Sequence, residues 1–259
     1  IVEDVRKSGD DALRKYAKKF GCPELKTIKV TEEEFETAAK KLDDSMKKAI
    51  FRCVGNVRKF HEEQMRRVEK HWMVDIEPGV RAGEQVTPID AVGLYVPRGK
   101  GFFPSTVYML SLPAVIAGVK GIHIATPPNA DGTSGIATLF TAKLCGVNNV
   151  YKVGGAQAIA ALAYGTQSVP RVRKTLGPGS PFVQAAKQLL FGILDPGMPA
   201  CSSESVILAD ETADGKALEA ALDDAASGEL ELADPADAQD RSDREEQAEQ
   251  TLDLKPKRK

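Results

Sequence analysis

Three short glycine-rich segments are the first candidates for chemistry in this sequence. Each follows a run of apolar residues, and they are Pro97–Gly101, Gly154–Gln157 and Gly177–Ser180. Glycine lets backbone N–H groups approach a ligand closely, and the first segment also carries the cations Arg98 and Lys100. The second segment has neither the G-x-G-x-x-G nor the Walker pattern, and it places polar Gln157 at the start of an apolar run. The segments therefore predict a site for a polar, metabolite-like ligand without a standard phosphate loop.

Alternating strand and helix patterns from residue 91 onward explain how these segments come together. Short apolar runs predict strands at Val92–Val96, Gly121–Thr126, Val150–Val153, Val172–Leu176 and Ser205–Ala209. Helical patterns separate them near residues 105–118, 134–145, 156–164 and 181–191. Strands that alternate with helices form a parallel sheet, and ligands bind at the carboxyl ends of its strands. We therefore predict a Rossmann-like domain over residues 91–209.

The first 90 residues predict helices followed by a hairpin. Apolar residues recur at helical spacing up to about residue 70, and Thr31 with Glu34 forms a capping-box pattern. Short alternating runs broken at Glu77-Pro78-Gly79 are typical of a hairpin. Residues 1–90 are thus interpreted as a helical segment plus hairpin ahead of the Rossmann-like domain.

The composition changes sharply near the end of the sequence. Residues 210–259 hold sixteen acidic and seven basic side chains. Such a segment buries too little apolar surface to order itself, so we expect a divergent and largely disordered tail. The predicted fold class is therefore α/β: a helical N-terminal segment, a Rossmann-like parallel sheet and a disordered acidic C-terminal tail.

Charge and hydropathy argue against several function classes. The net charge of −2 and the isoelectric point near 6.0 give no reason to expect nucleic acid or a membrane surface as partner. The longest mostly apolar segment, residues 107–119, is too short for a transmembrane helix. Four cysteines without C-x-x-C spacing predict reduced thiols and a cytoplasmic location. Because Ile1 already lies in a helical pattern, we also expect an N-terminus cut from a longer chain.

Several longer motifs resemble the histidinol dehydrogenase family over residues 1–214. The most specific is Val153-Gly-Gly-Ala-Gln-Ala-Ile-Ala-Ala-Leu-Ala163, a run rarely imitated by chance. The others are Val5-Arg-x-x-Gly-Asp-x-Ala-Leu13, Val92-Gly-Leu-Tyr-Val-Pro97, Pro104-Ser-Thr-Val-Tyr-Met-Leu110, Pro113-Ala-x-x-Ala-Gly118 and Gly177-Pro-Gly179. The resemblance implies a zinc-dependent, NAD-linked enzyme that oxidises L-histidinol through the aldehyde to L-histidine. It also implies a homodimer, and a first domain that is completed by chain from beyond the second.

The resemblance also assigns site residues. The family's nicotinamide-site residues fall on Tyr95 and Gln157, and a third NAD contact falls on Ser180, where most members have Asn. Tyr95 offers an aromatic face and a hydroxyl, and the Gln157 amide both donates and accepts hydrogen bonds. The family's substrate-contacting serine falls on Ser203, although Cys201-Ser202 replaces the usual Gly-Pro before it.

The family's zinc ligands and its acid–base Glu-His pair have no counterpart in this sequence. The chain has three histidines, His61, His71 and His123, each interpreted as structural, and residues 223–228, where the first zinc ligands are expected, contain neither Gln nor His. We therefore assign no catalytic and no metal-binding residue, and expect a truncated or catalytically incomplete form, from a frameshift, a mis-joined gene or a natural truncation. Two alternatives stay open: a related NAD-dependent dehydrogenase of another small alcohol, and a non-catalytic nucleotide-binding remnant.

Overall fold

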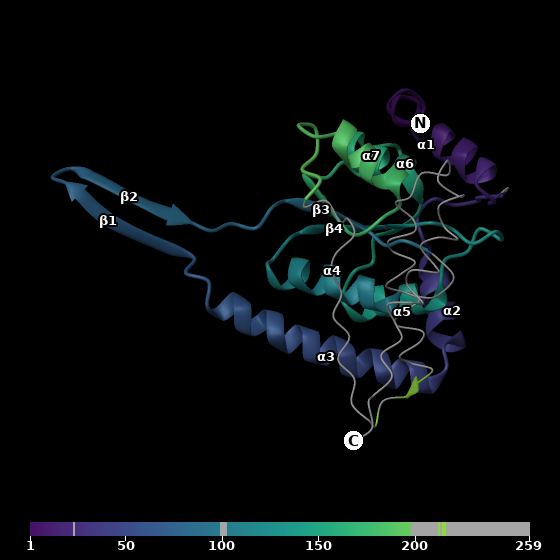
Figure 1. Cartoon of the computed structure of the whole chain (residues 1–259), viewed down its shortest axis with the longest axis horizontal. Coiled ribbons are helices and arrows are strands. Elements are labelled where there is room, and N and C mark those ends of the chain that lie inside the picture. Colours follow the sequence, from purple (N-terminus) through teal and green to yellow (C-terminus); the bar gives the residue numbers. More distant parts are fainter. Residues whose placement is uncertain (23, 99–102, 198–211, 213, 216–259) are drawn as a thin grey trace, which may run out of the picture. The chain divides into compact units, whose positions relative to one another are not determined.

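The computed structural model describes residues 1–22, 24–98, 103–197, 212, 214 and 215. Contacts divide the chain into two units, residues 1–200 and residues 201–259, and all elements below belong to the first (Figure 1). The helices are α1 (Val2–Lys19), α2 (Glu32–Lys41), α3 (Asp44–Arg66), α4 (Pro104–Ile116), α5 (Ile136–Leu144), α6 (Gly155–Tyr164) and α7 (Pro181–Leu189). The strands are β1 (His71–Glu77), β2 (Val80–Gln85), β3 (Ala91–Tyr95), β4 (Gly121–Thr126), β5 (Val150–Lys152) and β6 (Lys174–Leu176).

A parallel sheet with the strand order β5-β4-β3-β6 forms the centre of the first unit. Leu94 of β3 lies between Ile124 of β4 and Leu176 of β6. The chain runs from β3 through β4 to β5 on one side and then returns to place β6 on the other. The strand order therefore reverses between β3 and β6, and open α/β sheets bind their ligands at such a point, outside the carboxyl ends of the strands.

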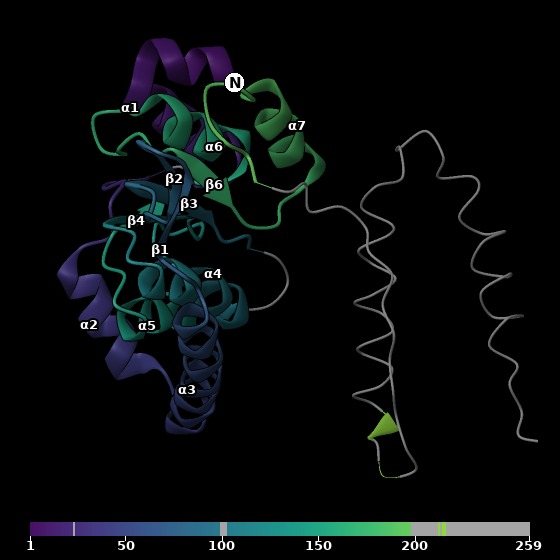
Figure 2. The same cartoon turned by 90° about the vertical axis from the view of Figure 1, so that its left-hand side faces the viewer.

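Helices cover both faces of this sheet (Figures 1 and 2). On one face α4 and α5 pack together, with α3 against α4 and α2 against α5; on the other, α6 contacts both α1 and α7. Two clusters of buried apolar side chains follow these layers, one containing Leu13, Ile159 and Val183, the other Val107 and Leu139. Helix α6 is buried from Ala156 to Ala163, which explains why its sequence is apolar on every side.

Local sequence signals account for several element ends. The predicted capping box of α2 is confirmed, since Glu34 N–H donates to Thr31 Oγ1 at 3.3 Å and Thr31 N–H donates to a Glu34 carboxylate oxygen at 2.9 Å. Just before α2, the N–H of Val30 donates to the carbonyl of Val150 at 2.9 Å. This antiparallel segment covers the outer edge of β5, which would otherwise be open to pairing with another chain.

Helix α1 contains a kink at Gly9 that is fastened to the loop after α6. The N–H of Asp10 donates to Gln167 Oε1 at 2.9 Å, and the Asp10 carboxylate accepts from the Ser168 hydroxyl at 2.5 Å and from the Ser168 N–H at 3.2 Å. The clamp joins residues that lie 158 positions apart in the sequence.

The predicted hairpin is confirmed as β1 and β2, which pair antiparallel and are exposed at every residue. Strand β6 starts at Lys174, two residues later than predicted, because the N–H of Val172 donates to the carbonyl of Leu162 rather than to a strand. The predicted strand at 205–209 and nearly all of the predicted tail lie outside the described residues. The α/β class is confirmed, whereas the domain boundary at residue 90 stays a prediction. No helix in the described ranges is long and apolar enough to cross a membrane.

Candidate functional site

Tyr95 connects two of the glycine-rich segments at the carboxyl end of β3. Its side chain is buried, and its hydroxyl accepts a hydrogen bond of 3.0 Å from the N–H of Gly155, the first residue of α6. Burial raises the pKa of the Tyr95 hydroxyl, and the Gly155 hydrogen bond opposes this shift without cancelling it. The hydroxyl therefore stays protonated at neutral pH, so it can accept a hydrogen bond from α6 and donate one to a ligand.

The backbone of Tyr95 contacts the third glycine-rich segment. Gly177 follows β6 with φ of 118°, and a Cβ atom at this position would collide with the Tyr95 carbonyl oxygen, so the position requires glycine. Ser180 is the N-cap of α7, is exposed, and makes no capping hydrogen bond with its side chain. The predicted NAD contact at Ser180 thus lies in the segment that packs on the predicted contact at Tyr95.

Gln157 lies in the first turn of α6 but does not cap the helix, because the N-cap is Gly154. Its side chain is 6% exposed, and its Oε1 is buried without a donor among the described residues. A buried acceptor without a partner costs about 1–3 kcal/mol, and a bound group that donates to it recovers this cost. The arrangement fits a ligand group that donates a hydrogen bond, such as a carboxamide N–H.

The described structure does not bring the other predicted residues to Tyr95 and Gln157. Arg98, one of the two loop cations, donates from Nη1 to the carbonyl of Pro128 at 2.6 Å, so it ties two loops together at the end of the sheet. Lys100 and Ser203 lie outside the described residues. The structure therefore brings Tyr95 together with the first turn of α6 and with Gly177, and leaves the role of Ser203 a prediction.

Lys187 is a buried residue beside the third segment that the sequence analysis missed. Its side chain is 2% exposed, its Nζ donates to the Gly177 carbonyl at 2.7 Å, and burial lowers the pKa of its ammonium group. A signal was present in the sequence, because Lys187 shares a helical face with Val183 and Leu190, which are both buried.

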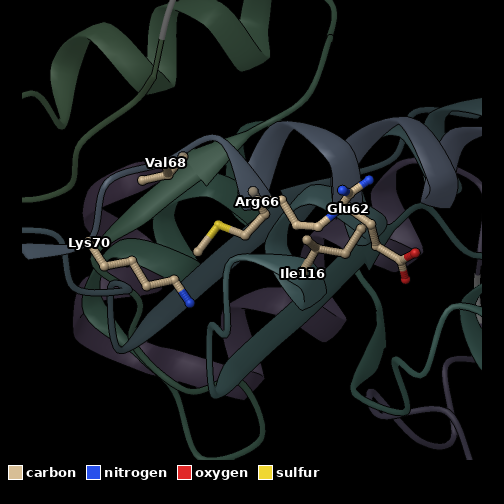
Figure 3. Close-up of a pocket in the computed structure, with 6 residues that line it drawn as sticks. Glu62, Arg66, Val68, Lys70 and Ile116 are labelled. Carbon is tan, nitrogen blue, oxygen red and sulfur yellow. The ribbon is translucent and has the colours of Figure 1, made fainter.

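The described part of the chain offers no metal-binding group of three His, Cys, Asp or Glu side chains, so the zinc that the resemblance implies is assigned no residue there. His123 is buried, and its Nδ1 lies 3.3 Å from the hydroxyl of Tyr151. A hollow at the end of α3 contains none of the predicted site residues (Figure 3). Its lining consists of Glu62, Met65, Arg66, Val68, Lys70 and Ile116.

Comparison with known proteins identifies the family. The family model for histidinol dehydrogenase matches residues 1–229. The chain belongs to the histidinol dehydrogenase family. A histidinol dehydrogenase homolog of Colwellia psychrerythraea is 51% identical over 218 residues, which make up 83% of this chain and 48% of that protein. The histidinol dehydrogenase of Synechocystis sp. is 46% identical over 218 residues, covering 83% of this chain and 50% of that protein.

A solved structure agrees with this assignment. The crystal structure of histidinol dehydrogenase from Elizabethkingia anophelis matches with a TM-score of 0.76 and 36% identity, covering 86% of this chain and 51% of that chain. The chain spans about half the length of the curated histidinol dehydrogenase relatives it matches.

Proposed function

We propose that this chain forms the NAD-binding part of a histidinol dehydrogenase-type oxidoreductase, whose reaction is the oxidation of L-histidinol to L-histidine at the end of histidine biosynthesis. The observation that carries the proposal is the buried Oε1 of Gln157, which has no hydrogen-bond donor among the described residues and lies in the helical turn whose first N–H donates to the Tyr95 hydroxyl. Both residues lie at the end of the sheet where α/β proteins bind dinucleotides. Membership of an oxidoreductase family supports the same assignment.

NAD would supply the hydride acceptor, and the residues of this chain would hold it. Gln157 Oε1 would accept a hydrogen bond from the nicotinamide carboxamide, which would remove the cost of an acceptor that has no donor among the described residues. Tyr95 presents a protonated hydroxyl, and Ser180 offers a second hydroxyl from the start of α7. The three side chains are uncharged at pH 7, so they would orient the cofactor and would not exchange protons with the substrate.

The chain by itself is proposed to be catalytically incomplete. Histidine is the usual proton shuttle and zinc ligand, and the sequence has none after His123. We assign substrate contact to Ser203, and we assign zinc and the acid–base step to parts of the longer relatives that have no counterpart here. A cytoplasmic location and a homodimer complete the proposal.

Calorimetric titration of the purified chain with NAD tests the binding step. We expect saturable binding to the chain, and no reduction of NAD when L-histidinol and zinc are added. The intact Synechocystis relative, assayed in parallel, should bind NAD and turn over. A chain that takes up no NAD contradicts the proposed site, and turnover of L-histidinol by the chain with zinc contradicts its proposed incompleteness.

A further inference from the structure

The ammonium group of Lys187 occupies an unusual position for a lysine. Lys187 is the seventh residue of α7. Its side chain is directed back toward the amino end of the helix, as long helical side chains are. Within the described ranges, the carbonyl of Gly177 is the one hydrogen-bond acceptor of the Lys187 ammonium, and no carboxylate pairs with it. Burying an ammonium is costly, so its single contact is expected to have a specific purpose.

That contact fastens the segment that carries Ser180. Gly177 and Ser180 bracket a four-residue connection between β6 and α7, and the outer end of the connection is already fixed as the N-cap of the helix. The hydrogen bond from Lys187 fixes the other end, where Gly177 packs on the Tyr95 carbonyl oxygen. A hydrogen bond from a charged donor is about twice as strong as a neutral one.

We propose that Lys187 is a positioning residue of the cofactor site, which holds the Gly177–Ser180 segment against Tyr95 so that the two NAD contacts keep a fixed separation. It touches no ligand and acts through the carbonyl of Gly177. The inference rests on the proposed function, because it gives the segment a role in NAD binding.

The test compares four variants of the full 259-residue chain with the unsubstituted chain. Lys187→Met removes the donor, and Lys187→Arg keeps a charged donor. Lys174→Met is the matched control, since Lys174 lies in the neighbouring β6 and donates to Asp195 instead of the segment. Leu139→Ala, in a different helical layer, controls for a general loss of stability. Amide hydrogen exchange over residues 177–183 is measured without ligand, and NAD affinity is measured by calorimetry.

Lys187→Met should speed exchange over residues 177–183 and weaken NAD binding by about tenfold, as expected for the loss of one charge-assisted hydrogen bond. Lys187→Arg should restore most of both properties, and the two control variants should leave both near the unsubstituted values. If Lys187→Met does not fold, Lys187→Gln, whose amide stops short of Gly177, is measured with the same expectation. Unchanged exchange and affinity in the Lys187 variants, or an equal loss in Leu139→Ala, would overturn the proposal.

The hydrogen-exchange and NAD-affinity measurements together distinguish a failure of this inference from a failure of the proposed function. If the unsubstituted chain binds no NAD, the proposed function fails together with the link to the cofactor. Faster exchange in Lys187→Met then still supports the positioning of the segment by Lys187. If the unsubstituted chain binds NAD and Lys187→Met binds it equally well, the inference alone is overturned.

Discussion

At the scale of single residues, Gln157 gives the sharpest separation between stability and function. Its Oε1 is buried and lacks a donor in the described structure. Gln157→Leu removes this acceptor at similar volume, so we expect the free energy of unfolding without ligand to stay equal or to rise by about 1 kcal/mol. NAD binding, in contrast, should weaken by about tenfold or more, because the bound group would lose its hydrogen-bond acceptor. Urea unfolding and an NAD titration measure the two effects, and a variant that binds NAD normally would contradict the assigned contact.

Two glycines inside helices predict opposite responses to alanine. Gly9 has φ of 51° and ψ of −127°, and a Cβ atom there would collide with Gln167 Oε1, which holds the N–H of Asp10. Gly9→Ala should therefore lower the free energy of unfolding by about 1–3 kcal/mol. Gly55 in α3 has open space around its would-be Cβ, so Gly55→Ala should raise it by about 0.5–1 kcal/mol. Urea unfolding measures both changes. A change of the same sign in the two variants would contradict the interpretation that the kink requires glycine at position 9.

His123 makes the stability of the fold depend on pH. Burial, and to a lesser degree the charge of Lys29, lower the pKa of His123 in the folded chain. The unfolded chain takes up this proton below about pH 6.5 while the folded chain excludes it, so the stabilising contribution is present above that pH and is lost as the pH falls. In His123→Phe, the drop in unfolding free energy between pH 7.5 and pH 5.5 should be smaller than in the unsubstituted chain. Equal drops would show that another group is responsible.

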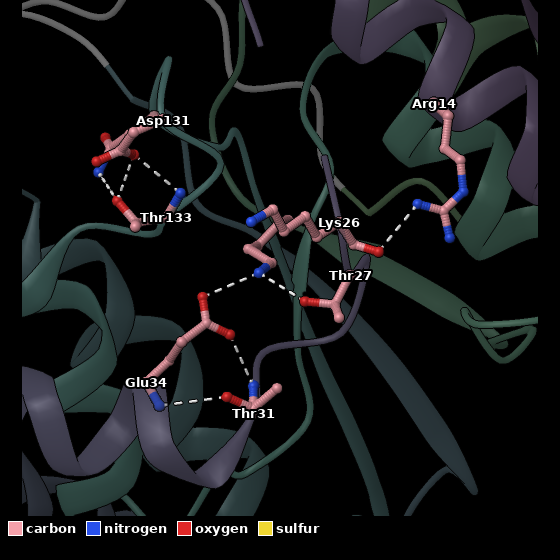
Figure 4. A network of polar contacts seen from close by, with 9 residues as sticks. Arg14, Lys26, Thr27, Thr31, Glu34, Asp131 and Thr133 are labelled. Carbon is pink, nitrogen blue, oxygen red and sulfur yellow. Dashed lines mark hydrogen bonds and ion pairs between the residues drawn. The ribbon is translucent and has the colours of Figure 1, made fainter. Parts of the chain in front are cut away.

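At the scale of elements, a partly buried ion pair joins the end of β5 to the start of α2. Lys152 Nζ lies 2.9 Å from Glu34 Oε1 and 2.9 Å from Thr27 Oγ1. The second carboxylate oxygen of Glu34 completes the capping box with Thr31 (Figure 4). The side chains of Lys152 and Glu34 are 4% and 23% exposed. The pair therefore connects the helix to the strand that leads into Gly154.

A double-mutant cycle measures this connection. Glu34→Gln leaves the buried ammonium of Lys152 without a carboxylate and should cost about 3 kcal/mol, whereas Lys152→Met should cost less because the Glu34 carboxylate reaches water. The double variant should cost less than the sum, with a coupling of about 1–3 kcal/mol. The exposed pair Lys143–Glu32, which joins α5 to the same helix, is the control and should couple by less than about 0.5 kcal/mol. Similar coupling in both cycles would contradict the importance of burial.

The elements themselves were largely predictable, because their signals are local. The alternation of apolar runs identified β3, β4 and β5 within a residue or two, and Thr31 with Glu34 identified the start of α2. The position of the N-terminal helices was not predictable in this way. A helical stripe shows that one face is buried, but not that α1 covers α6 while α2 and α3 cover α5 and α4.

The candidate site was predictable only in part, for a related reason. The motif around Gln157 indicated the residue. The lack of a donor to its Oε1 among the described residues, and the hydrogen bond from Gly155 to Tyr95, depend on loops that meet across the sheet. Lys187 was missed because a lysine in an apolar stripe reads as an ordinary surface cation until its side chain is seen to turn inward.

At the scale of the whole molecule, the packing of α1 on α6 has a consequence for synthesis on the ribosome. The clamp between Asp10 and Ser168 spans 158 positions, so α1 leaves the ribosome long before its partner exists. At about 5–20 residues per second, that interval is roughly 8–30 s. Throughout it the apolar face of α1, with Val5, Leu13 and Tyr16, has no helix to bury it. Nascent chains of this protein are therefore expected to depend on chaperone binding at α1, and to release the chaperone once residues 155–168 have emerged.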